Sequence, residues 1–567
     1  MSEIKDKILR AALQNALEHG KTNEKIILGK ILGIEASLRN QIKEIMPEIK
    51  EIVTYVNQIS QDQIRQQIQD KFPDLLVEKP KKQDEREGLP PLEGAERGRV
   101  VTRFPPEPNG YPHIGHAKAA IIDEEYAKMY DGKLILRFDD TNPEAERLEY
   151  YAAIKVGLDW LEVKYDRIKN TSDDIELLYK KCQEMLDGNY AYVCTCKQET
   201  ISANRREMKA CKCRSLEMEQ SRERWDKMFS KFGQGDAIVR FRGDMSSNNT
   251  VMRDPVLFRI IETKHPLLGD KYRVWPSYDF AVAIEDSIDG ITHAFRTKEY
   301  ELRNELYYTI LDLLKMRKPQ VIEFSRLGFE GMPVSKRILR PLIEDGKVSG
   351  YDDPRLPTLE ALKRRGIVPE AIRKFVMSLG FTKADTLAPF ESLESFNRKI
   401  VDPTSIRLHM IKNPVSIRIK SLPSDSITMA NHPTKDIGNR EVDLGDELFL
   451  ESEDIENLKP DEAIRLIGLG NIKITNKSPL EATYIGDEMG TSIPKAHWVS
   501  QKSAQKIKIL IPSQPFNGEE FNPSSLEEIN VFTEPYYNEL KEGREIQFVR
   551  FGYCRKDSML QAIYTHK

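Results

Sequence analysis

The stretch "RVVTRFPPEPNGYPHIGHAKAAIIDEEYAKMYDGKLILRFDD", residues 99–140, predicts a strand, a helix and a second strand in turn. "RVVTRF" predicts a buried strand, "IGHAKAAIIDEEYAKMY" a helix that ends at Gly132, and "KLILRFDD" a second strand. Two strands joined by a helical crossover form the βαβ unit of a parallel, doubly wound sheet. The fold class predicted from this stretch is therefore α/β.

The turn from the first strand into the helix carries two histidines one turn apart. Such a turn lies at the carboxyl edge of the sheet, where open α/β folds bind nucleotides, and a helix N-terminus presents free N–H groups to phosphates. His113 and His116 project from nearly one face, and Gly115 leaves room for a flat base or ribose against the helix backbone. The alternative is a proline-rich turn that merely starts a helix with two solvated histidines.

Composition indicates a large protein of ordinary globular type. A chain of 567 residues, 31% charged and 39% hydrophobic, should divide into several domains. The net charge of −4 excludes a uniformly basic nucleic-acid binder, so any such surface must be a local patch. No run is long enough to span a bilayer and no secretory segment is recognisable, which predicts a cytoplasmic protein without a membrane partner. Six cysteines, four of them within 194–213, fit a reducing compartment.

The composition and the spacing of apolar residues change several times along the rest of the chain. Apolar residues at helical spacing between residues 4 and 76, Leu38 among them, predict a small helical region, and residues 78–98 have linker composition. Further sheet signals, "YRVWPSYDFAVAIED" and "ITHAFRT", come so much later that an insertion must interrupt the sheet. Residues 355–400 predict helices. After about residue 411, the short runs "VSIRIK", "EVDLGDELFL", "NIKIT" and "EIQFVRFGY" predict antiparallel barrels.

Several motifs in order resemble one protein family. "PHIGH" resembles the HIGH signature of class I aminoacyl-tRNA synthetases, and "MPVSKRILR", some 220 residues later, resembles their second signature, KMSKS. "LRFDDTNP", "VMRDPVLFRI", "GITHAFRTKEY", "EFSRL" and "DDPRLPTLEALKRRGI" are similar to the glutamyl and glutaminyl subgroup, and "NHPTKDIGNREV" and "HWVS" to its archaeal and eukaryotic members. The resemblance runs from about residue 99 to the end and covers the helical region before residue 98 least.

The resemblance implies a multidomain α/β plus all-β protein. Its parts would be a Rossmann-type doubly wound parallel sheet, an acceptor-binding insertion, a helical connecting domain and C-terminal antiparallel β-barrels. The expected bounds are 1–77 for the N-terminal helices, 78–98 for the linker, 99–175 and 273–325 for the two catalytic halves, 176–272 for the insertion with a zinc site, 326–410 for the second signature loop and the stem-contact helices, and 411–567 for the anticodon-binding barrels.

The resemblance also implies catalytic residues. His113 and His116 would bind the phosphates of ATP, and Lys336 would stabilise the developing pyrophosphate together with Mg²⁺. Pro333 departs from the second signature, where the first lysine is expected, but close relatives also have "SKR", which retains Lys336. A basic surface turn is the alternative for "SKR" alone. The residues expected to bind ATP are Pro106, Glu107, Gly115, Ser335 and Arg337.

The amino-acid substrate would lie among three further residues, Arg103, Asp139 and Tyr278, of which the first two have the right charges for a carboxylate and an α-ammonium group. Glutamine-specific relatives have a small neutral residue where this chain has Arg296, whereas glutamate enzymes have an arginine. A guanidinium pairs bidentately with a carboxylate, so we expect glutamate. The alternatives are a phosphate-binding or structural role for Arg296, a glutaminyl enzyme, and a catalytically silent tRNA-binding paralogue.

The insertion contains two cysteine pairs, "CTC" and "CKC". Four thiolates, Cys194, Cys196, Cys211 and Cys213, can close a tetrahedral structural zinc site, and some glutamyl enzymes have a related site with one histidine ligand. Free buried cysteines are the alternative. Residues 204–231 hold nine Lys/Arg against five Asp/Glu, a local excess that suits a tRNA acceptor stem.

The expected reaction is ATP-dependent activation of L-glutamate to an adenylate, followed by transfer to the terminal ribose 2′-hydroxyl of tRNA(Glu). Relatives in this subgroup need bound tRNA for activation, which we expect here too. The sequence leaves open tRNA(Gln) as a second acceptor, and a protein partner of the N-terminal helices.

Overall fold

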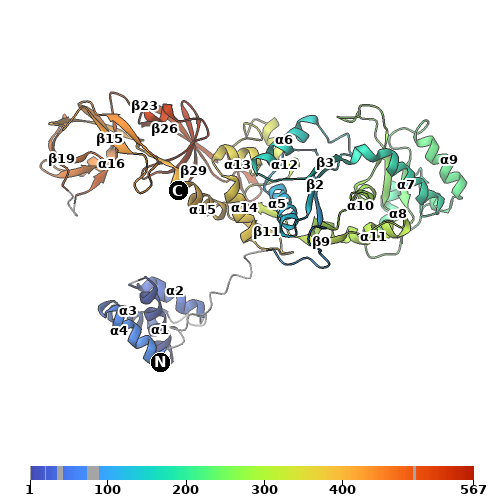
Figure 1. The fold of residues 1–567 in the computed structure, drawn as a ribbon, viewed down its shortest axis with the longest axis horizontal. Coiled ribbons are helices and arrows are strands. Elements are labelled where there is room, and N and C mark those ends of the chain that lie inside the picture. The colour runs from blue at the N-terminus through green and yellow to red at the C-terminus, as the bar shows by residue number, and fades with distance from the viewer. Residues whose placement is uncertain (1, 20, 35–41, 73–88, 489–492) are drawn as a thin grey trace. The chain divides into compact units, whose positions relative to one another are not determined.

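The chain divides into two compact units, Met1–Glu87 and Gly88–Lys567 (Figure 1). The computed structural model describes residues 2–19, 21–34, 42–72, 89–488 and 493–567. Leu38 and the greater part of the predicted linker, residues 78–88, lie outside the described residues.

The first unit confirms the predicted N-terminal helices. They are α1 (Ser2–His19), α2 (Glu24–Ile34), α3 (Ile42–Gln58) and α4 (Gln61–Lys71). Each helix contributes to one core, as Ile8, Ile27, Ile49 and Ile68 illustrate. Ser60 caps α4 by accepting the N–H of Gln63 on its side chain. The unit therefore has an apolar core of its own.

The predicted βαβ unit is present at the start of the second unit. It comprises β1 (Val101–Phe104), α5 (Ile114–Met129) and β2 (Lys133–Phe138), followed by α6 (Leu148–Trp160) and β3 (Arg167–Asn170). β1, β2 and β3 pair in parallel. Later in the chain β8 (His293–Thr297) and β9 (Gln320–Phe324) also pair in parallel, and β8 adjoins β1, where the Thr292 N–H donates to the carbonyl of Val101. The carboxyl ends of these strands share one edge.

One predicted strand segment is wrong. "YRVWPSYDFAVAIED" contains only the short β7 (Val274–Pro276) and then forms α10 (Tyr278–Ile288). Phe280, Ala281 and Ile284 are buried at helical spacing, and a short apolar run has the same composition in a strand or a helix. β7 also belongs to the sheet of the insertion and not to the parallel sheet.

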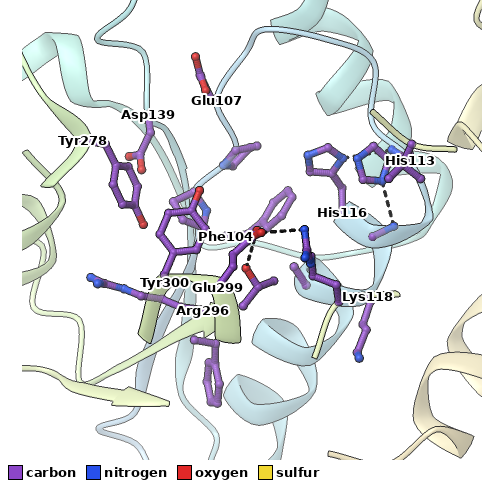
Figure 2. A pocket seen from close by; sticks show the side chains of 18 of the residues that line it. Phe104, Glu107, His113, His116, Lys118, Asp139, Tyr278, Arg296, Glu299 and Tyr300 are labelled. Atoms are coloured by element: carbon purple, nitrogen blue, oxygen red, sulfur yellow. Dashed lines mark hydrogen bonds and ion pairs between the residues drawn. The ribbon is translucent and has the colours of Figure 1, made fainter. Parts of the chain in front are cut away.

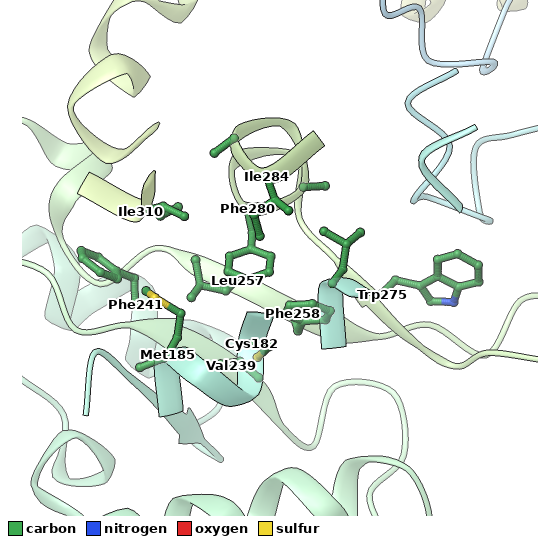
Figure 3. Close-up of a cluster of buried hydrophobic side chains, with 14 of the residues drawn as sticks. Cys182, Met185, Val239, Phe241, Leu257, Phe258, Trp275, Phe280, Ile284 and Ile310 are labelled. Carbon is green, nitrogen blue, oxygen red and sulfur yellow. The ribbon is translucent and has the colours of Figure 1, made fainter. Parts of the chain in front are cut away.

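The insertion folds around an antiparallel sheet, in the order β4-β5-β6-β7. Its elements are α7 (Ile175–Asp187), β4 (Ala191–Cys194), α8 (Gln198–Arg206), α9 (Met218–Met228), β5 (Ile238–Phe241) and β6 (Val256–Ile260). One core joins α7 and this sheet to α10 and to α11 (Asn304–Leu313), through residues such as Met185, Phe258, Phe280 and Ile310 (Figure 3). This shared core fixes the insertion against the helices that follow it.

Helices predominate again between the second signature and residue 401, as predicted. They are α12 (Lys336–Glu344), α13 (Leu359–Arg365), α14 (Pro369–Ser378) and α15 (Phe390–Val401). β10 (Leu327–Phe329) pairs in parallel with β11 (Thr386–Ala388), which brings the segment after α14 back beside the second signature.

The β-rich part contains two seven-stranded sheets, and each of the four β-type runs forms strands, as predicted. The first sheet has the order β12 (Ile406–Leu408), β27 (Glu545–Phe548), β28 (Gly552–Ser558), β29 (Gln561–His566), β23 (Gln505–Pro512), β26 (Leu526–Thr533), β13 (Met410–Ile411). The second has the order β21 (Lys495–Ala496), β18 (Ala463–Leu466), β19 (Gly470–Lys477), β20 (Leu480–Gly486), β14 (Pro414–Lys420), β17 (Glu447–Glu451), β22 (Trp498–Ser500). Smaller elements are the ribbons β15 (Ser426–Ala430) with β16 (Asn439–Asp443) and β24 (Phe516–Asn517) with β25 (Glu520–Phe521), and the short helices α16 (Ser452–Ile455) and α17 (Tyr536–Glu539).

Within the described part of the chain, none of the helices combines the length and the apolarity needed to cross a bilayer.

Candidate active site

A cavity of about 1020 Å³ lies at the carboxyl edge of the parallel strands (Figure 2). Residues from β1, α5, α10, β8 and the start of α12 line it, so segments more than 200 residues apart meet there. The cavity brings together all twelve residues that the sequence analysis predicted outside the cysteine cluster. They are Arg103, Pro106, Glu107, His113, Gly115, His116, Asp139, Tyr278, Arg296, Ser335, Lys336 and Arg337.

The two histidines form a reciprocal cap at the start of α5. His113 Nδ1 accepts the N–H of Gly115 at 3.1 Å, and His116 Nδ1 accepts the N–H of His113 at 3.2 Å. Burial lowers the pKa of His116 to about 4, helped by Lys336, and lowers the pKa of His113 well below its usual value. Both rings are therefore neutral near pH 7, and because each Nδ1 accepts a hydrogen bond from a backbone N–H, the ring proton of each histidine is on Nε2. The pair can donate two hydrogen bonds to an anion.

The second signature reaches the same place. Lys336 is the first residue of α12, and its stem lies over the loop that precedes the histidines, since a Cβ on Gly110 would be 2.8 Å from Lys336 Cε. Burial raises the pKa of the Glu107 carboxyl, and the nearby charge of Lys336 acts in the opposite direction. The Lys336 ammonium group and two imidazole donors thus converge on one region.

The opposite end of the cavity carries an incompletely bonded carboxylate. Asp139 Oδ1 accepts from Arg137 Nε and Thr171 Oγ1, both at 3.0 Å. Asp139 Oδ2 is buried and has no hydrogen-bond partner among the described residues. Figure 2 places Asp139 beside Tyr278. A buried acceptor of this kind suits an ammonium group.

Three arginines surround one buried carboxylate at this end. Asp286 accepts from Arg103 Nε at 3.0 Å, from an Arg137 terminal nitrogen at 2.9 Å and from an Arg296 terminal nitrogen at 3.4 Å. The arginines hold the pKa of Asp286 below its usual range, although its burial acts in the opposite direction. Tyr307 Oη donates to the same carboxylate at 3.1 Å. Asp286 therefore orients the arginines.

Arg296 has the weakest attachment of the three. Its guanidinium carbon lies 4.1 Å from the centre of the Tyr307 ring, and its buried Nε has no hydrogen-bond partner within the described part of the chain. Arg103 differs, because its guanidinium also donates to the carbonyl of Phe295 at 2.7 Å. Arg296 thus keeps more donors available to a ligand than Arg103 does.

Sequence reasoning missed Arg137, Asp286 and Tyr307, as well as Lys118, whose ammonium group lies in the cavity wall. Arg137 and Asp286 stand inside quoted motifs, "LRFDD" and "AIED", but neither motif assigns them a partner. Asp286 in particular was part of the segment predicted to be a strand. Composition alone contains no signal that these side chains meet.

The four predicted cysteines form a second cluster, in the insertion. Their sulfur atoms all lie within 4.8 Å of one another, and the pairs Cys194–Cys211 and Cys196–Cys213 are 3.8 Å apart. Zn–S bonds of about 2.3 Å in a tetrahedron require sulfur atoms about 3.8 Å apart. Arg224 donates to Cys213 Sγ at 3.4 Å, which favours a thiolate. The donor set therefore fits zinc.

Three family models match the chain. They are "tRNA synthetases class I (E and Q), catalytic domain" over residues 99–403, and two anti-codon binding domains of the same group over 405–485 and 495–557. The first covers more than half of the chain. It includes the cavity and the cysteine cluster.

Full-length relatives agree. The chain is 61% identical to a glutamate–tRNA ligase of Nitrosopumilus maritimus and 57% identical to one of Cenarchaeum symbiosum, over the whole of both chains in each case. It is 38% identical to a glutamate–tRNA ligase of Pyrococcus furiosus, again over the whole of both chains. The chain belongs to the glutamyl and glutaminyl family of class I tRNA synthetases. Members with this catalytic domain and anticodon-binding domains use tRNA, an amino acid and ATP.

Proposed function

We propose that this protein is a glutamate–tRNA ligase. One observation carries the proposal: the same cavity contains both signature segments and a pair of incompletely bonded groups, Asp139 Oδ2 and Arg296 Nε. The carboxylate suits the α-ammonium group of an amino acid and the guanidinium suits an acidic side chain. The full-length identity to glutamate–tRNA ligases supports the same conclusion.

In the first step an oxygen of the α-carboxylate of glutamate attacks the α-phosphorus of ATP, which forms glutamyl-adenylate and releases pyrophosphate. Charge builds on phosphate oxygens, and the Nε2–H groups of His113 and His116 together with Lys336 are arranged to receive it. Mg²⁺ would arrive with ATP. Arg296 and Asp139 hold the two ends of glutamate, so that the attacking oxygen is directed to the phosphate.

In the second step the terminal ribose 2′-hydroxyl of tRNA attacks the adenylate carbonyl, with AMP as the leaving group. The helices after the second signature and the two seven-stranded sheets belong, in this proposal, to the surface that binds tRNA. We assign Zn²⁺ to Cys194, Cys196, Cys211 and Cys213, where it would close the loop ends of the insertion as a structural ion.

Three finer parts of the proposal concern partners and place. tRNA(Gln) is a candidate second acceptor. The helices of residues 2–72 are a candidate site for a protein partner, because they form a unit of their own. The proposed location of the protein is the cytoplasm. A glutaminyl enzyme is disfavoured by the buried Arg296, since a neutral amide would leave that charge without a partner.

Charging tests the proposal most simply. Purified tRNA(Glu) and tRNA(Gln) are each incubated with the protein, ATP and labelled glutamate or glutamine. The proposal predicts labelled glutamate on tRNA(Glu) and no labelled glutamine on either tRNA. Glutamine on tRNA(Gln) would establish the rival enzyme, and no charging with either amino acid would establish a silent paralogue. Glutamate on tRNA(Gln) would add the second acceptor.

A further inference from the structure

The cavity contains a buried ammonium group that the reaction above does not use. Lys118, on α5, is 2% exposed and lines the cavity two residues after His116 in the chain (Figure 2). Its Nζ donates to the backbone oxygen of Ser325 at 2.6 Å and to Ser325 Oγ at 2.8 Å. Burial lowers the pKa of Lys118 to about 8, against the opposing effect of Asp385. An ammonium group is thus kept inside the protein by two oxygens of one serine.

Ser325 begins a segment that we call the nucleotide wall, residues 325–328, which follows β9 and includes the first two residues of β10. All four of its residues line the cavity. The nucleotide wall is attached to the segment before β11, because the Ser325 N–H donates to the carbonyl of Thr382 at 2.8 Å and the Arg326 N–H to Asp385 at 3.2 Å. Through its two bonds to Ser325, Lys118 also ties the nucleotide wall to α5. That helix also carries the two histidines.

The nucleotide wall closely approaches the first turn of α5. A Cβ on Gly115 would lie 3.4 Å from the carbonyl oxygen of Leu327 and 2.9 Å from Cε1 of His113. The cavity beside the histidines is therefore bounded by the nucleotide wall on one side, with backbone groups that can contact the flat edge of a base. A shift of the nucleotide wall by a few tenths of an ångström would change the fit of a base there.

Burying a charged amine costs free energy, so its position calls for a physical reason. Hydrogen bonds donated by an ammonium group are stronger than those of a neutral side chain, and the charge also suits a cavity that receives a polyanion. We propose that Lys118 is a positioning residue for nucleotide recognition: through Ser325 it fixes the nucleotide wall against α5, and so sets affinity and base selectivity for ATP. This rests on the proposed function, in which ATP binds this cavity.

The test compares Lys118→Met and Lys118→Arg with the unchanged full-length protein. ATP affinity is measured by equilibrium dialysis without amino acid, and base selectivity by the ratio of kcat/KM for ATP and GTP in pyrophosphate exchange with glutamate and tRNA. Lys118→Met should weaken ATP binding by about tenfold or more and lower the ATP-to-GTP ratio by about fivefold. The KM for glutamate should stay within about twofold of that of the unchanged protein. Lys118→Arg should have an ATP affinity and an ATP-to-GTP ratio between those of the unchanged protein and Lys118→Met.

Lys556→Met is the matched control. Lys556, on β28, is 1% exposed and donates to the carbonyls of Tyr537 at 2.8 Å and Leu540 at 2.6 Å, but it does not line the cavity. It should lower the thermal midpoint and leave ATP affinity and the ATP-to-GTP ratio unchanged.

The proposal is overturned if Lys118→Met keeps both nucleotide properties or loses only thermal stability, as the control does. If Lys118→Met does not fold, Lys118→Arg decides: a loss of ATP affinity of about threefold or more supports the proposal, and unchanged affinity overturns it. Because the dialysis needs no amino acid, a protein that binds ATP but does not use glutamate would refute the proposed function and still test Lys118.

Discussion

Replacing Arg296 with alanine should remove most of the enzyme's preference for glutamate and leave its fold largely intact. Arg296 is 5% exposed and makes a single bond to Asp286, at 3.4 Å, whereas Arg103 makes two bonds to that carboxylate, at 3.0 and 3.4 Å. Asp286 would keep Arg103, Arg137 and Tyr307 as partners. The stability cost should therefore be about 1–2 kcal/mol, mostly from the lost contact with the Tyr307 ring.

The effect on glutamate should be much larger. Removing one member of a buried, hydrogen-bonded charge pair costs about 2–5 kcal/mol, and about 3 kcal/mol corresponds to a loss of about 150-fold in kcat/KM. Arg296→Lys keeps the charge without the bidentate geometry and should lose about tenfold. The assay is charging of tRNA(Glu) over a range of glutamate concentrations, with the KM for ATP as an internal reference.

Arg317→Ala is the control for this prediction. Arg317 donates to the backbone oxygen of Asp286 from outside the cavity, so its loss perturbs the same helix without touching the substrate. It should change kcat/KM for glutamate by no more than about twofold. Equal losses in the Arg296 and Arg317 variants, or an Arg296→Ala variant with unchanged kcat/KM, would refute the assignment of Arg296 to the glutamate side chain.

Three further outcomes are expected. Asp286→Asn should lower the free energy of unfolding by about 3–5 kcal/mol in denaturant titrations, because it leaves three buried arginines short of a counter-charge. Since the folded-state pKa of Asp286 is lowered, this contribution to stability is present above about pH 4 and is lost as the pH falls further. Equal stability of the variant and the parent at pH 7 would contradict the prediction. The profile of kcat/KM for ATP against pH should show no break near 6.5, because His116 has a pKa of about 4 and stays neutral; a break there that disappears in His116→Asn would contradict the assigned protonation. Metal analysis of the purified protein should find one zinc per chain and none in Cys211→Ser, and the variant should have a lower thermal midpoint than the parent. A parent protein that contains no metal and has the same thermal midpoint as Cys211→Ser would favour free cysteines.

The parts of the fold that sequence predicted correctly are those in which local pattern and tertiary structure agree. The first βαβ unit is one example, since Gly132 both ends the helix pattern and lies where a Cβ would be 2.2 Å from the carbonyl oxygen of Val100. The strands of the β-rich part were found because buried and exposed residues alternate, as in β14, where Ile417 and Ile419 are buried. Neither feature depends on distant parts of the chain.

The segment that became α10 was mispredicted because its apolar residues are too few to distinguish the period of a strand from that of a helix. Packing decided it: Phe280 and Ile284 face the core that α10 shares with the insertion (Figure 3). That core is built from residues far apart in sequence, so local pattern could not indicate it.

The site shows the same division. The motifs led to His113, His116, Lys336 and Arg296, and the structure brings these residues into one cavity. Their individual roles remain predictions. Asp286 could not be found, because its importance arises from contacts with arginines such as Arg103, 183 residues away in sequence. A side chain that orients others has no local sequence signal.

ATP–pyrophosphate exchange in the presence of tRNA(Glu) tests the central claim most directly, because it reports amino-acid activation in this cavity without the transfer step. Exchange that requires glutamate, and that glutamine does not support at the same concentration, is the predicted result. Exchange driven equally well by glutamine would contradict the assignment of the amino acid, and no exchange with either would contradict the assignment of the cavity as a site of activation.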